Sequence, residues 1–567
     1  MKKYFLFIVI TCLMVIASGC QAITVELTAT PVLPTKMTTE PALDNLIPTE
    51  TPETELPQSR VGWWNGTTWY EIFVRSFKDS DGDGIGDFRG IIEKLDYLND
   101  GDPSTTSDLG ITGIWLMPIM PSPSYHGYDI TDYMTVNPQY GTMDDFKELL
   151  QACHERGIRV IIDFVVNHTS TEHPWFEAAL KGDPEYKDYY VWQKEDPGSP
   201  GPWGQDPWHS GSNGEFYYGA FWGGMPDLNY HNPKVTEEIY AISDFWVKEV
   251  GVDGFRVDAA RYLVEDGWAL QDSEANIQWF RDWNDHLKSI NPDIFTIGEV
   301  WAENAVIERY ADGQGMSALF AFDLAEDLKG AVFAPDPSRI IKSYNNTRAI
   351  SLSNSFGAFL SNHDQQRVAA MLGDRLRKLK LAAFVYLTGP GMPFVYYGEE
   401  IGMLGSKPDE FLRTPMQWSG QANGGFSSGQ PWEALNSDWA DRNVDVQNGN
   451  PESLLNLYRQ LINLRSAHPG LNDGGYASFS SNCRTLYATL RMSGEEIILT
   501  AINIGNTEVK ECSITLEPGV MGAGTFVVED LFGSSHLSEV NFSEIEQSIV
   551  LAPVIASGEA FIARLTR

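Results

Sequence analysis

Short apolar runs alternate with amphipathic segments through the middle of the chain. Between residues 68 and 400, eight runs rich in β-branched and aromatic side chains are separated by stretches with apolar residues at helical spacing. Several runs are continuously apolar, which is typical of parallel strands buried on both faces. Eight strand–helix alternations predict an α/β fold, a (β/α)8 TIM barrel. The runs are residues 68–77, 111–120, 159–168, 252–260, 293–301, 317–325, 356–364 and 392–400.

This alternation is interrupted once and then replaced. The gap between the third and fourth runs is too long for one helix, and residues from about 168 to 229 are rich in Trp, Gly and Pro. This segment predicts an inserted B subdomain over the barrel mouth. Beyond residue 471, alternating strands with turn signals predict a C-terminal antiparallel β-sandwich over 472–567, which leaves 61–471 for the barrel and its insert.

The first sixty residues predict an export signal and a tether. Two lysines precede an apolar run over 4–16, which is too short to span a membrane, so residues 1–19 are interpreted as a signal peptide. Three small residues before Cys20 resemble a bacterial lipobox, which makes Cys20 the expected lipidation site. An ordinary signal peptide with an incidental cysteine is the alternative. Residues 20–60, rich in Thr, Pro and Glu, form the expected tether of an extracytoplasmic enzyme that is lipid-anchored to a bacterial cell membrane.

Charge and composition narrow the classes of partner. The chain has 77 acidic against 40 basic residues, a formal net charge of -37, which argues against nucleic acid because phosphates are bound by clustered Lys and Arg. The aromatic content of 12% argues against a disordered acidic chain. Cys153 is expected in the core. Cys483 and Cys512 could pair outside the cytoplasm, although their spacing does not decide it.

Polar residues concentrate where the predicted barrel strands end, which is where barrel enzymes place their chemistry. Carboxylates at the ends of three different strands are expected to converge on one pocket. This suits glycoside hydrolysis, in which one carboxylate attacks the anomeric carbon and another protonates the leaving oxygen. A lone carboxylate is more often a cap or an ion-pair partner, but three together with two histidines and an arginine favour chemistry. The residues are Asp163, Asn167, His168, Arg256, Asp258, Glu299, His363 and Asp364.

Four of these stretches carry a resemblance to a known family. DFVVNH (163–168), GFRVDAAR (254–261), GEVW (298–301) and FLSNHD (359–364) resemble the signature regions of the α-amylase superfamily, glycoside hydrolase family 13. The resemblance implies that Asp258 is the nucleophile, Glu299 the general acid/base and Asp364 the carboxylate that stabilises the distorted sugar. It also implies that His168 and His363 bind sugar hydroxyls and that Tyr128 is an aromatic platform, with a core tyrosine as the alternative.

Each catalytic role has a physical requirement. Asp258 must be ionised to attack, and Arg256, two residues earlier on the same strand face, is expected to favour its charged form. Glu299 must be protonated in the resting complex. Its pKa is therefore expected to be raised by neighbouring carboxylates and partial burial.

Two further motifs bear on substrate preference. MPDLN (225–229) and RTPMQW (413–418) resemble the oligo-1,6-glucosidase and neopullulanase neighbourhood, and the intermediate form of MPDLN resembles lipoprotein α-amylases. Related α-glucosidases read D-N-G-Y-D where this chain has Tyr125 in the place of the first Asp. The missing anchor for a chain end predicts an open cleft, with Tyr125 free to stack on a further glucose. Packing of Tyr125 against the insert is the alternative.

A loop after the first run predicts a calcium site. Carboxylates at every second position around a Gly turn suit Ca2+, although the twelfth position is Gly90, so the loop is not an EF-hand. A solvated Asp/Gly turn is the alternative. Asn167 resembles the ligand of a second calcium in many amylases, with no other ligand identifiable. The expected ligands in the loop are Asp79, Asp81, Asp83, the Ile85 carbonyl and Asp87.

The sequence therefore predicts a retaining α-glucan hydrolase, an endo-acting α-amylase that cleaves α-1,4 bonds of starch and maltooligosaccharides. An α-glucosidase, an oligo-1,6-glucosidase or a neopullulanase-like enzyme is the alternative. More remote alternatives are a non-catalytic amylase-like protein, which the complete carboxylate triad argues against, and a sugar-binding lipoprotein, which would have two α/β lobes. The oligomeric state stays open.

Overall fold

The computed structural model describes residues 62–567 except 268, 313, 352–353 and 546. The expected signal peptide, the lipidation site Cys20 and the tether lie outside the described residues, and these expectations stay predictions. All elements below belong to one unit, residues 58–567. Within the described chain, no helix combines the length and apolar character needed to cross a membrane.

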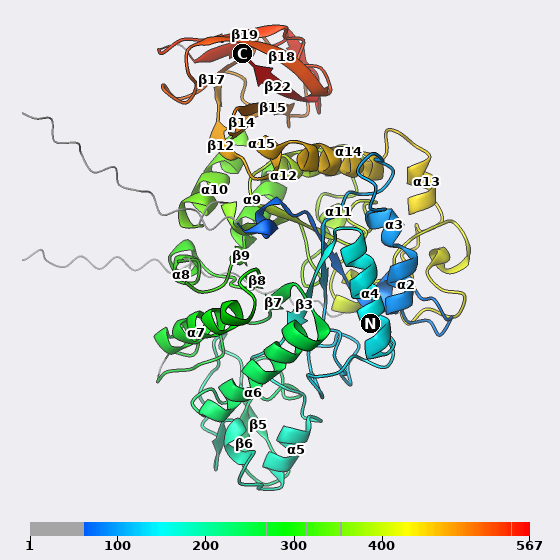
Figure 1. Ribbon diagram of the computed structural model, residues 1–567, viewed down its shortest axis with the longest axis vertical. Helices are drawn as coiled ribbons and strands as arrows, with labels where there is room; N and C mark the ends of the chain where they lie inside the picture. Colours follow the sequence, from blue (N-terminus) through cyan, green and yellow to red (C-terminus); the bar gives the residue numbers. More distant parts are fainter. Residues whose placement is uncertain (1–61, 268, 313, 352–353, 546) are drawn as a thin grey trace, which may run out of the picture. The chain divides into compact units, whose positions relative to one another are not determined.

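Eight parallel strands of the described chain close into a barrel in the order β1-β11-β10-β9-β8-β7-β3-β2 (Figure 1). Each predicted run supplies one strand, so the predicted barrel is confirmed. Trp69 pairs with both Gly113 on β2 and Phe394 on β11, which closes the ring. The strands are β1 (Trp69–Ile72), β2 (Gly113–Leu116), β3 (Arg159–Phe164), β7 (Gly254–Val257), β8 (Phe295–Gly298), β9 (Ala318–Phe320), β10 (Phe356–Phe359) and β11 (Met392–Tyr396).

Some predicted runs contain more than a strand. The first run continues as helix α1 (Val74–Phe77), and the sixth passes into α9 (Phe322–Phe333). Polar signals set the helix ends. Thr142 caps α4 (Met143–Glu155) in a reciprocal capping box with Asp145. The other α-helices are α2 (Phe88–Glu93), α3 (Leu95–Leu98), α5 (Pro174–Leu180), α6 (Pro233–Asp244), α7 (Glu274–Ile290), α8 (Asn304–Tyr310), α10 (Pro337–Ile350), α11 (Val368–Met371), α12 (Leu376–Leu387), α13 (Val444–Asn448), α14 (Leu454–Ala467) and α15 (Pro469–Asn472).

Stacked aromatic side chains fill the interior of the barrel. The Trp69 ring lies 5.1 Å from Phe295 and 5.4 Å from Phe394, nearly parallel to each, and all three side chains are buried. Trp115 packs against Phe320 at 5.4 Å. The barrel is therefore a solid core, and the functional surface is left to the loops that follow its strands.

The insert after β3 has its own small sheet. Strands β4 (Trp192–Gln193), β6 (Phe216–Tyr218) and β5 (Trp208–Ser210) pair antiparallel beside α5. Phe176 on α5 stacks on Trp192 at 5.6 Å. An isolated bridge between His168 and Asp227 joins the two ends of the insert next to the barrel. The predicted B subdomain after the third strand is present.

The C-terminal part consists of antiparallel sheets, as predicted. A six-stranded sheet of the described residues has the order β12-β14-β15-β22-β18-β19, with smaller sheets β13-β17-β20 and β16-β21 beside it. Its strands are β12 (Gly475–Ser478), β13 (Ser480–Ser481), β14 (Leu486–Ser493), β15 (Glu496–Asn503), β16 (Val509–Lys510), β17 (Ser513–Thr515), β18 (Gly524–Phe532), β19 (Glu539–Phe542), β20 (Ser548–Val550), β21 (Val554–Ile555) and β22 (Ala560–Thr566).

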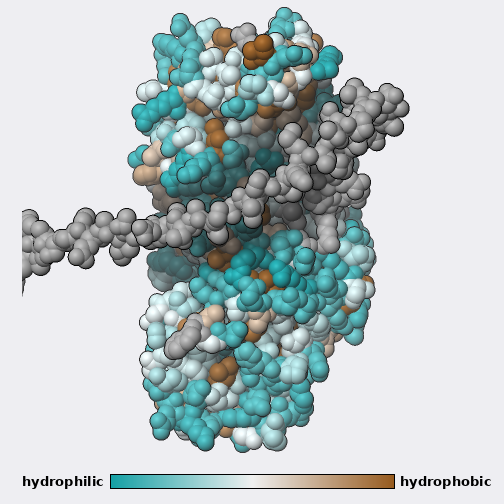
Figure 2. Space-filling model, turned by 90° about the vertical axis from the view of Figure 1, so that its left-hand side faces the viewer, coloured by the Kyte–Doolittle hydropathy of each residue, from teal (hydrophilic) through white to brown (hydrophobic). Residues whose placement is uncertain are grey.

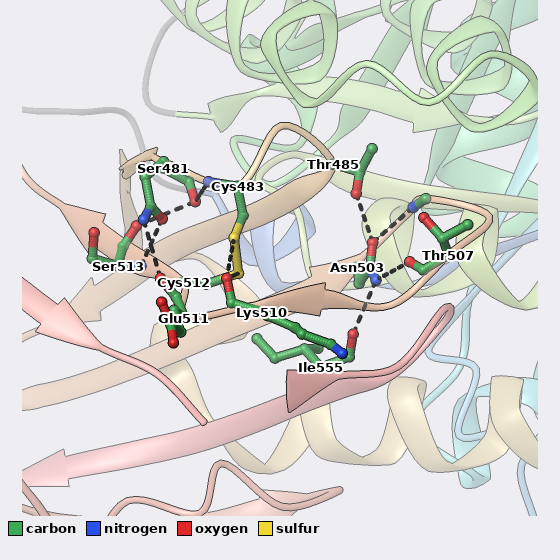
Figure 3. The surroundings of a disulfide bond; sticks show 12 residues. Ser481, Cys483, Thr485, Asn503, Thr507, Lys510, Glu511, Cys512, Ser513 and Ile555 are labelled. Carbon is green, nitrogen blue, oxygen red and sulfur yellow. Dashed lines mark hydrogen bonds between the residues drawn. A yellow bond between two sulfur atoms is a disulfide. The ribbon is translucent and has the colours of Figure 1, made fainter. Parts of the chain in front are cut away.

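Three cysteines lie among the described residues, and two of them form the disulfide that the sequence left open. Cys483 and Cys512, 29 residues apart, form a disulfide that joins the start of β14 to the loop before β17 (Figure 3). Asn482 adds to this link by donating a hydrogen bond to the Glu511 carbonyl and accepting one from the Ser513 N–H. Cys153 is a free, fully buried thiol on α4, which confirms its expected place in the core.

One face of the molecule is mostly hydrophilic (Figure 2). On the face that Figure 2 presents, apolar residues form small separate patches between polar ones. This is the distribution expected of a strongly acidic chain of net charge -37.

Candidate active site

The predicted carboxylates meet at one cavity of about 500 Å³ at the carboxyl ends of the barrel strands. Asp258 follows β7, Glu299 follows β8 and Asp364 follows β10, and all three line the cavity. The cavity is closed on one side by the insert, whose residues contribute Trp203 and Phe221. The geometry therefore brings together residues that are far apart in the sequence.

Arg256 on β7 connects the acidic groups. Its guanidinium is almost fully buried and donates to Asp163 and to Asp258 at 2.8 Å and to Glu299 at 2.6 Å. It also lies 5.1 Å from the centre of the Trp115 ring. A buried cation surrounded by three carboxylates offsets part of their mutual repulsion, and it fixes the positions of Asp258 and Glu299 relative to each other.

Asp258 and Glu299, two of the three carboxyl groups that contact Arg256, have raised pKa values. Burial raises the pKa of Glu299 to about 7, with Asp258 and Asp364 adding to the rise and Arg256 opposing it. Burial also raises the pKa of Asp258, because it outweighs the opposing Arg256 charge. The rise expected for Glu299 is present, although burial is the larger cause. The effect expected of Arg256 on Asp258 is also present but does not set the net direction.

Asp364 has the opposite electrostatic environment. Burial would raise its pKa, but His363 at 3.2 Å and Arg413 at 2.8 Å hold that pKa well below its ordinary value. His363 also contacts Glu71 on β1 at 2.6 Å. Burial lowers the pKa of His363, but the charges of Asp364 and Glu71 outweigh burial and raise that pKa to about 10. This histidine is therefore a cation at neutral pH.

Tyr128 and His168 line the same cavity as predicted. The Tyr128 ring stacks on the His363 ring at 5.6 Å, and its hydroxyl lies 2.7 Å from His363 Nε2 and donates to Asp163. His168 Nε2 lies 3.2 Å from the Tyr128 carbonyl oxygen. Burial lowers the pKa of His168 to about 4, so this histidine is neutral and its single N–H points at the Tyr128 carbonyl.

The structure places Tyr125 differently from both readings of the sequence. Its ring stacks on Trp432 at 5.3 Å and lies 5.8 Å from the Arg413 guanidinium, and it does not contribute to the cavity lining. The expectation that Tyr125 stacks on a further glucose is therefore not supported. The packing alternative is not supported either, because the stacking partner Trp432 lies beyond the eighth strand and outside the insert.

Several cavity residues were not assigned by the sequence. Arg413, the first residue of RTPMQW, ion-pairs with Asp364 at 2.8 Å and with Asp409 at 3.5 Å. The sequence shows the motif, but the spacing of its residues does not show that Arg413 contacts Asp364, which follows β10. Further lining residues come from loops without a regular pattern. They are His126, Trp203, Phe221, Trp222, Met225, Ala259, Arg261, Tyr262, Trp301 and Asp409.

The acidic loop after β1 gathers oxygen atoms as a cation site requires. Carboxylate oxygens of Asp79, Asp81 and Asp87 lie within 4.8 Å of one another. Asp83 is outside this group, and its carboxylate accepts the Ile85 N–H. Gly84 has a φ of +94°, and a Cβ there would lie 1.9 Å from the Gln430 carbonyl oxygen, so the turn requires glycine. Three of the expected ligands fit a cation in the loop.

A second set of buried oxygens lies between the barrel and the insert. Asn167 Oδ1, Asp227 Oδ2 and Glu265 Oε1 are buried and have no hydrogen-bond partner among the described residues. The Asn167 side chain contacts Asp227, and Asp227 and Glu265 repel each other. Burial and Glu265 raise the pKa of Asp227 well above its ordinary value, and burial raises that of Glu265 to about 7. Unpaired buried acceptors are costly, and a bound cation would satisfy all three.

Comparison with protein families agrees with this geometry. The α-amylase catalytic-domain model matches residues 71–474, which begin within β1 and include the other seven barrel strands and every cavity residue. The chain belongs to the α-amylase family. Its members are glycoside hydrolases of family 13, so the protein is a glycoside hydrolase that acts on α-glucans.

Individual relatives cover nearly the same region. The chain is 40% identical over 465 residues to α-amylase 3 of Dictyoglomus thermophilum, which covers 80% of this chain and 89% of the relative. It is 32% identical over 534 residues to an oligo-1,6-glucosidase of Bacillus cereus, covering 80% and 92%. A crystal structure of an α-amylase from H. orenii superposes with a TM-score of 0.77 at 38% identity, covering 88% of this chain and 99% of that chain.

Proposed function

We propose that the protein is a retaining, endo-acting α-amylase that cleaves α-1,4 bonds of starch and maltooligosaccharides. The observation that supports it most is the Arg256 guanidinium, which contacts Asp258 and Glu299 at 2.8 and 2.6 Å. Because one guanidinium touches both carboxylates, their separation suits the short distance of retaining enzymes, about 5 Å, in which no water lies between them.

In the proposed reaction, Glu299 donates its proton to the glycosidic oxygen while Asp258 attacks the anomeric carbon. The raised pKa of Glu299, about 7, keeps the acid protonated at neutral pH. The ionised Asp364 binds the hydroxyls of the distorted sugar, whose ring rests on Tyr128. The His363 cation is buried behind Asp364 and holds its carboxylate at 3.2 Å rather than lining the cavity. Water then hydrolyses the ester to Asp258, with Glu299 acting as the base.

Variants of the two reacting carboxylates test this assignment. Asp258→Asn and Glu299→Gln should each reduce kcat by about a thousandfold or more with an unchanged melting temperature, since the two groups act as a unit. NMR of the first product should show the α-anomer. Near-normal turnover in either variant, or release of the β-anomer, would overturn the assignment.

Cleavage within the glucan chain is supported by the lining of the cavity. Exposed aromatic rings from the insert and from the loop after β8 extend the cavity beyond the reacting carboxylates, and such rings stack on glucose units. The Tyr125 ring does not support cleavage within the chain, because it does not line the cavity. Iodine staining of starch should fall faster than reducing ends accumulate, with maltose and maltotriose ahead of glucose.

An α-glucosidase that acts on short oligosaccharides is the second candidate. It is favoured by Arg413 and Asp409, which narrow the cavity beside Asp364, and by the similarity to an oligo-1,6-glucosidase. Glucose as the sole first product, with little loss of iodine colour, would select this candidate.

The proposed enzyme holds calcium at two places. Asp79, Asp81 and Asp87 would hold one ion in the loop after β1, and Asn167, Asp227 and Glu265 a second beside the insert. Each ion would neutralise carboxylates that otherwise repel one another, and it would stabilise the loops around the cavity. Neither ion takes part in the proton transfers above.

The proposed location is the outer face of a bacterial membrane, where a lipid on Cys20 and a tether over 20–60 hold the enzyme. The sequence before Cys20 supports this. Wild-type protein should fractionate with membranes and carry a lipid by mass spectrometry, whereas Cys20→Ser should be released or remain unprocessed. Unlipidated wild type in the medium would contradict the anchor.

A further inference from the structure

A carboxylate on β1 is buried close to the active-site cavity. The Glu71 side chain is almost fully buried and does not line the cavity, so it does not contact a substrate there. A buried carboxylate is costly unless a cation or hydrogen-bond donors face it. In the part of the chain that the structure describes, its ion-pair partner is His363, whose Nδ1 lies 2.6 Å from Glu71 Oε1. The hydrolytic steps leave Glu71 without a role.

His363 links Glu71 to Asp364. Its Nδ1 faces Glu71, and its Nε2 lies 3.2 Å from Asp364 Oδ2 and 2.7 Å from the Tyr128 hydroxyl oxygen. The Tyr128 ring stacks on the imidazole at 5.6 Å and the Trp115 ring meets it edge-on at the same distance, which holds its plane. An imidazolium can donate from both nitrogens, whereas a neutral ring has one N–H and would turn a lone pair toward one carboxylate. The geometry therefore suits the charged ring.

Groups of both signs surround His363 and Glu71. Burial lowers the pKa of His363, and the charges of Asp364 and Glu71 outweigh burial and raise that pKa to about 10. The nearby arginines oppose a positive charge on this ring, so the two direct contacts with carboxylates are its main support. The surrounding groups are Tyr128 after β2, Asp163 on β3, Arg256 on β7, Glu299 after β8, Tyr396 on β11 and Arg413 beyond β11.

We propose that Glu71 is a positioning residue, which keeps His363 charged and its Nε2–H directed at Asp364. This inference rests on the proposed function, in which Asp364 binds the distorted sugar in its ionised form. A buried aspartate orients the catalytic histidine of Ser-His-Asp hydrolases in a similar way. Here the oriented histidine supports a carboxylate instead of a nucleophile, so Glu71 affects the reaction without contacting the sugar.

Loss of the Glu71 charge should change the state of His363 within the assayed pH range. Glu71→Gln keeps the size of the side chain and an oxygen that accepts from Nδ1–H, but it removes the negative charge. An opposite charge at this distance shifts a pKa by about one to three pH units, so the pKa of His363 should fall from about 10 by that amount. A cation is lost as the pH rises through its pKa. The variant should therefore lose the charge on His363, and with it the support of Asp364, at lower pH than wild type.

The test measures kcat and KM for α-maltosyl fluoride from about pH 5 to about pH 9.5. Fluoride leaves without a proton, so deprotonation of Glu299 limits this substrate little and the state of His363 becomes visible. For wild type, kcat/KM should stay level to about pH 9, whereas for Glu71→Gln it should begin to fall about one pH unit or more earlier. The loss should be in kcat rather than in KM, because Asp364 binds the sugar in its distorted form.

Two further variants separate the charge of Glu71 from its packing. Glu71→Asp keeps the charge and shortens the side chain, so its alkaline limb should stay close to that of wild type. A role in packing alone predicts the reverse order, with Glu71→Asp more impaired than Glu71→Gln. Glu400→Gln is the matched control, because Glu400 is fully buried after β11, accepts from the Tyr70 and Tyr97 hydroxyls and does not line the cavity. Its pH profile should be that of wild type.

An alkaline limb in Glu71→Gln at the wild-type position, or the same shift in Glu400→Gln, would overturn the role of Glu71 and leave the hydrolase proposal standing. NMR of the ring nitrogens in wild type gives a check that does not depend on how the variants fold. Both nitrogens of His363 should be protonated at about pH 8, and a neutral ring would contradict the inference. A wild type that neither releases fluoride nor digests starch would overturn the proposed function itself.

Discussion

The protonation of Glu299 depends on burial more than on any single neighbour. Its pKa of about 7 lies above the ordinary value for glutamate, so the acid form persists to neutral pH and is lost as the pH rises further. With maltotriose or starch, kcat/KM should therefore fall above pH about 7 with the slope of one proton.

The leaving group offers a control for this pH dependence. Fluoride departs without protonation, so the alkaline fall of kcat/KM should be much weaker with α-maltosyl fluoride than with maltotriose. Identical alkaline limbs for both substrates would contradict the role of Glu299 as the acid. Phe333→Ala, at the end of α9 and outside the cavity, should show the wild-type profile.

Residues at strand ends were predictable from the sequence, whereas residues on loops were not. Asp258, Glu299 and Asp364 follow strands whose apolar runs are visible in the chain, and parallel strands in a barrel bring their carboxyl ends together. Arg413 reaches Asp364 only because the chain after β11 returns to the cavity. Tyr125 was misplaced for the same reason, since its partner Trp432 is 307 residues away (432 - 125) on another loop.

At the scale of elements, the loop after β1 has one feature that the sequence predicts, its alternating Asp and Gly residues, and one that it does not, the burial of Asp79. The alternating Asp and Gly residues predict a cation loop. The sequence did not show that Asp79 is buried, accepting from the Ser427 hydroxyl and the N–H groups of Gly82 and Gly84. Asp79 therefore has a structural role that remains without metal, which makes the more exposed Asp81 the better residue for a test.

The number of bound calcium ions tests the two proposed sites, one in the loop after β1 and one beside the insert. Purified protein should carry about two calcium ions per chain, and Asp81→Ala and Asp227→Asn should each lose one. Because an ion bound only to the native state stabilises it by mass action, either variant and EDTA should lower the melting temperature by several degrees. Elemental analysis and thermal scans with and without calcium measure both effects.

An exposed aspartate elsewhere provides the control for the metal sites. Asp102 lies in another acidic loop, where its carboxylate accepts the Ser104 N–H. Asp102→Ala should keep both ions and the wild-type melting temperature. Wild type that contains no calcium and whose melting curve EDTA does not change would contradict both sites. If only one of the variants Asp81→Ala and Asp227→Asn loses an ion, the site of the unaffected variant would be contradicted.

Strand prediction succeeded where burial is two-sided and failed at the edges of the C-terminal sheets. The barrel strands and β14, β15 and β22 carry nearly continuous apolar runs. Strands β19, β20 and β21 were not predicted. Each has few buried side chains among exposed ones, such as exposed Glu539 and Asn541 beside buried Val540 and Phe542. Such short edge strands depend on their partners rather than on their own pattern.

For the whole described molecule, the buried Arg491 joins the C-terminal sheets to the barrel, next to a second buried arginine that binds carbonyls of the barrel side. Arg491 on β14 donates to the Thr388 carbonyl at the end of α12 and to the Gly474 carbonyl. Arg465 on α14 donates to the carbonyls of Leu387, Gly389, Gly391 and Asn472. Burial and the nearby Arg465 charge lower the pKa of Arg491 to about 9, so it remains charged at neutral pH. These contacts couple the folding of the two parts.

Loss of Arg491 should uncouple the barrel from the C-terminal sheets. Arg491→Ala leaves buried carbonyls unpaired, at a cost of about 1–3 kcal/mol for each such group, and removes a link between the parts. Calorimetry of wild type should show one cooperative transition, whereas Arg491→Ala should show an earlier transition of the C-terminal part. Arg564→Ala is the control, because Arg564 on β22 ion-pairs only with the exposed Glu529 among the described residues and should shift the transition little. Two separate transitions already in wild type would contradict the coupling.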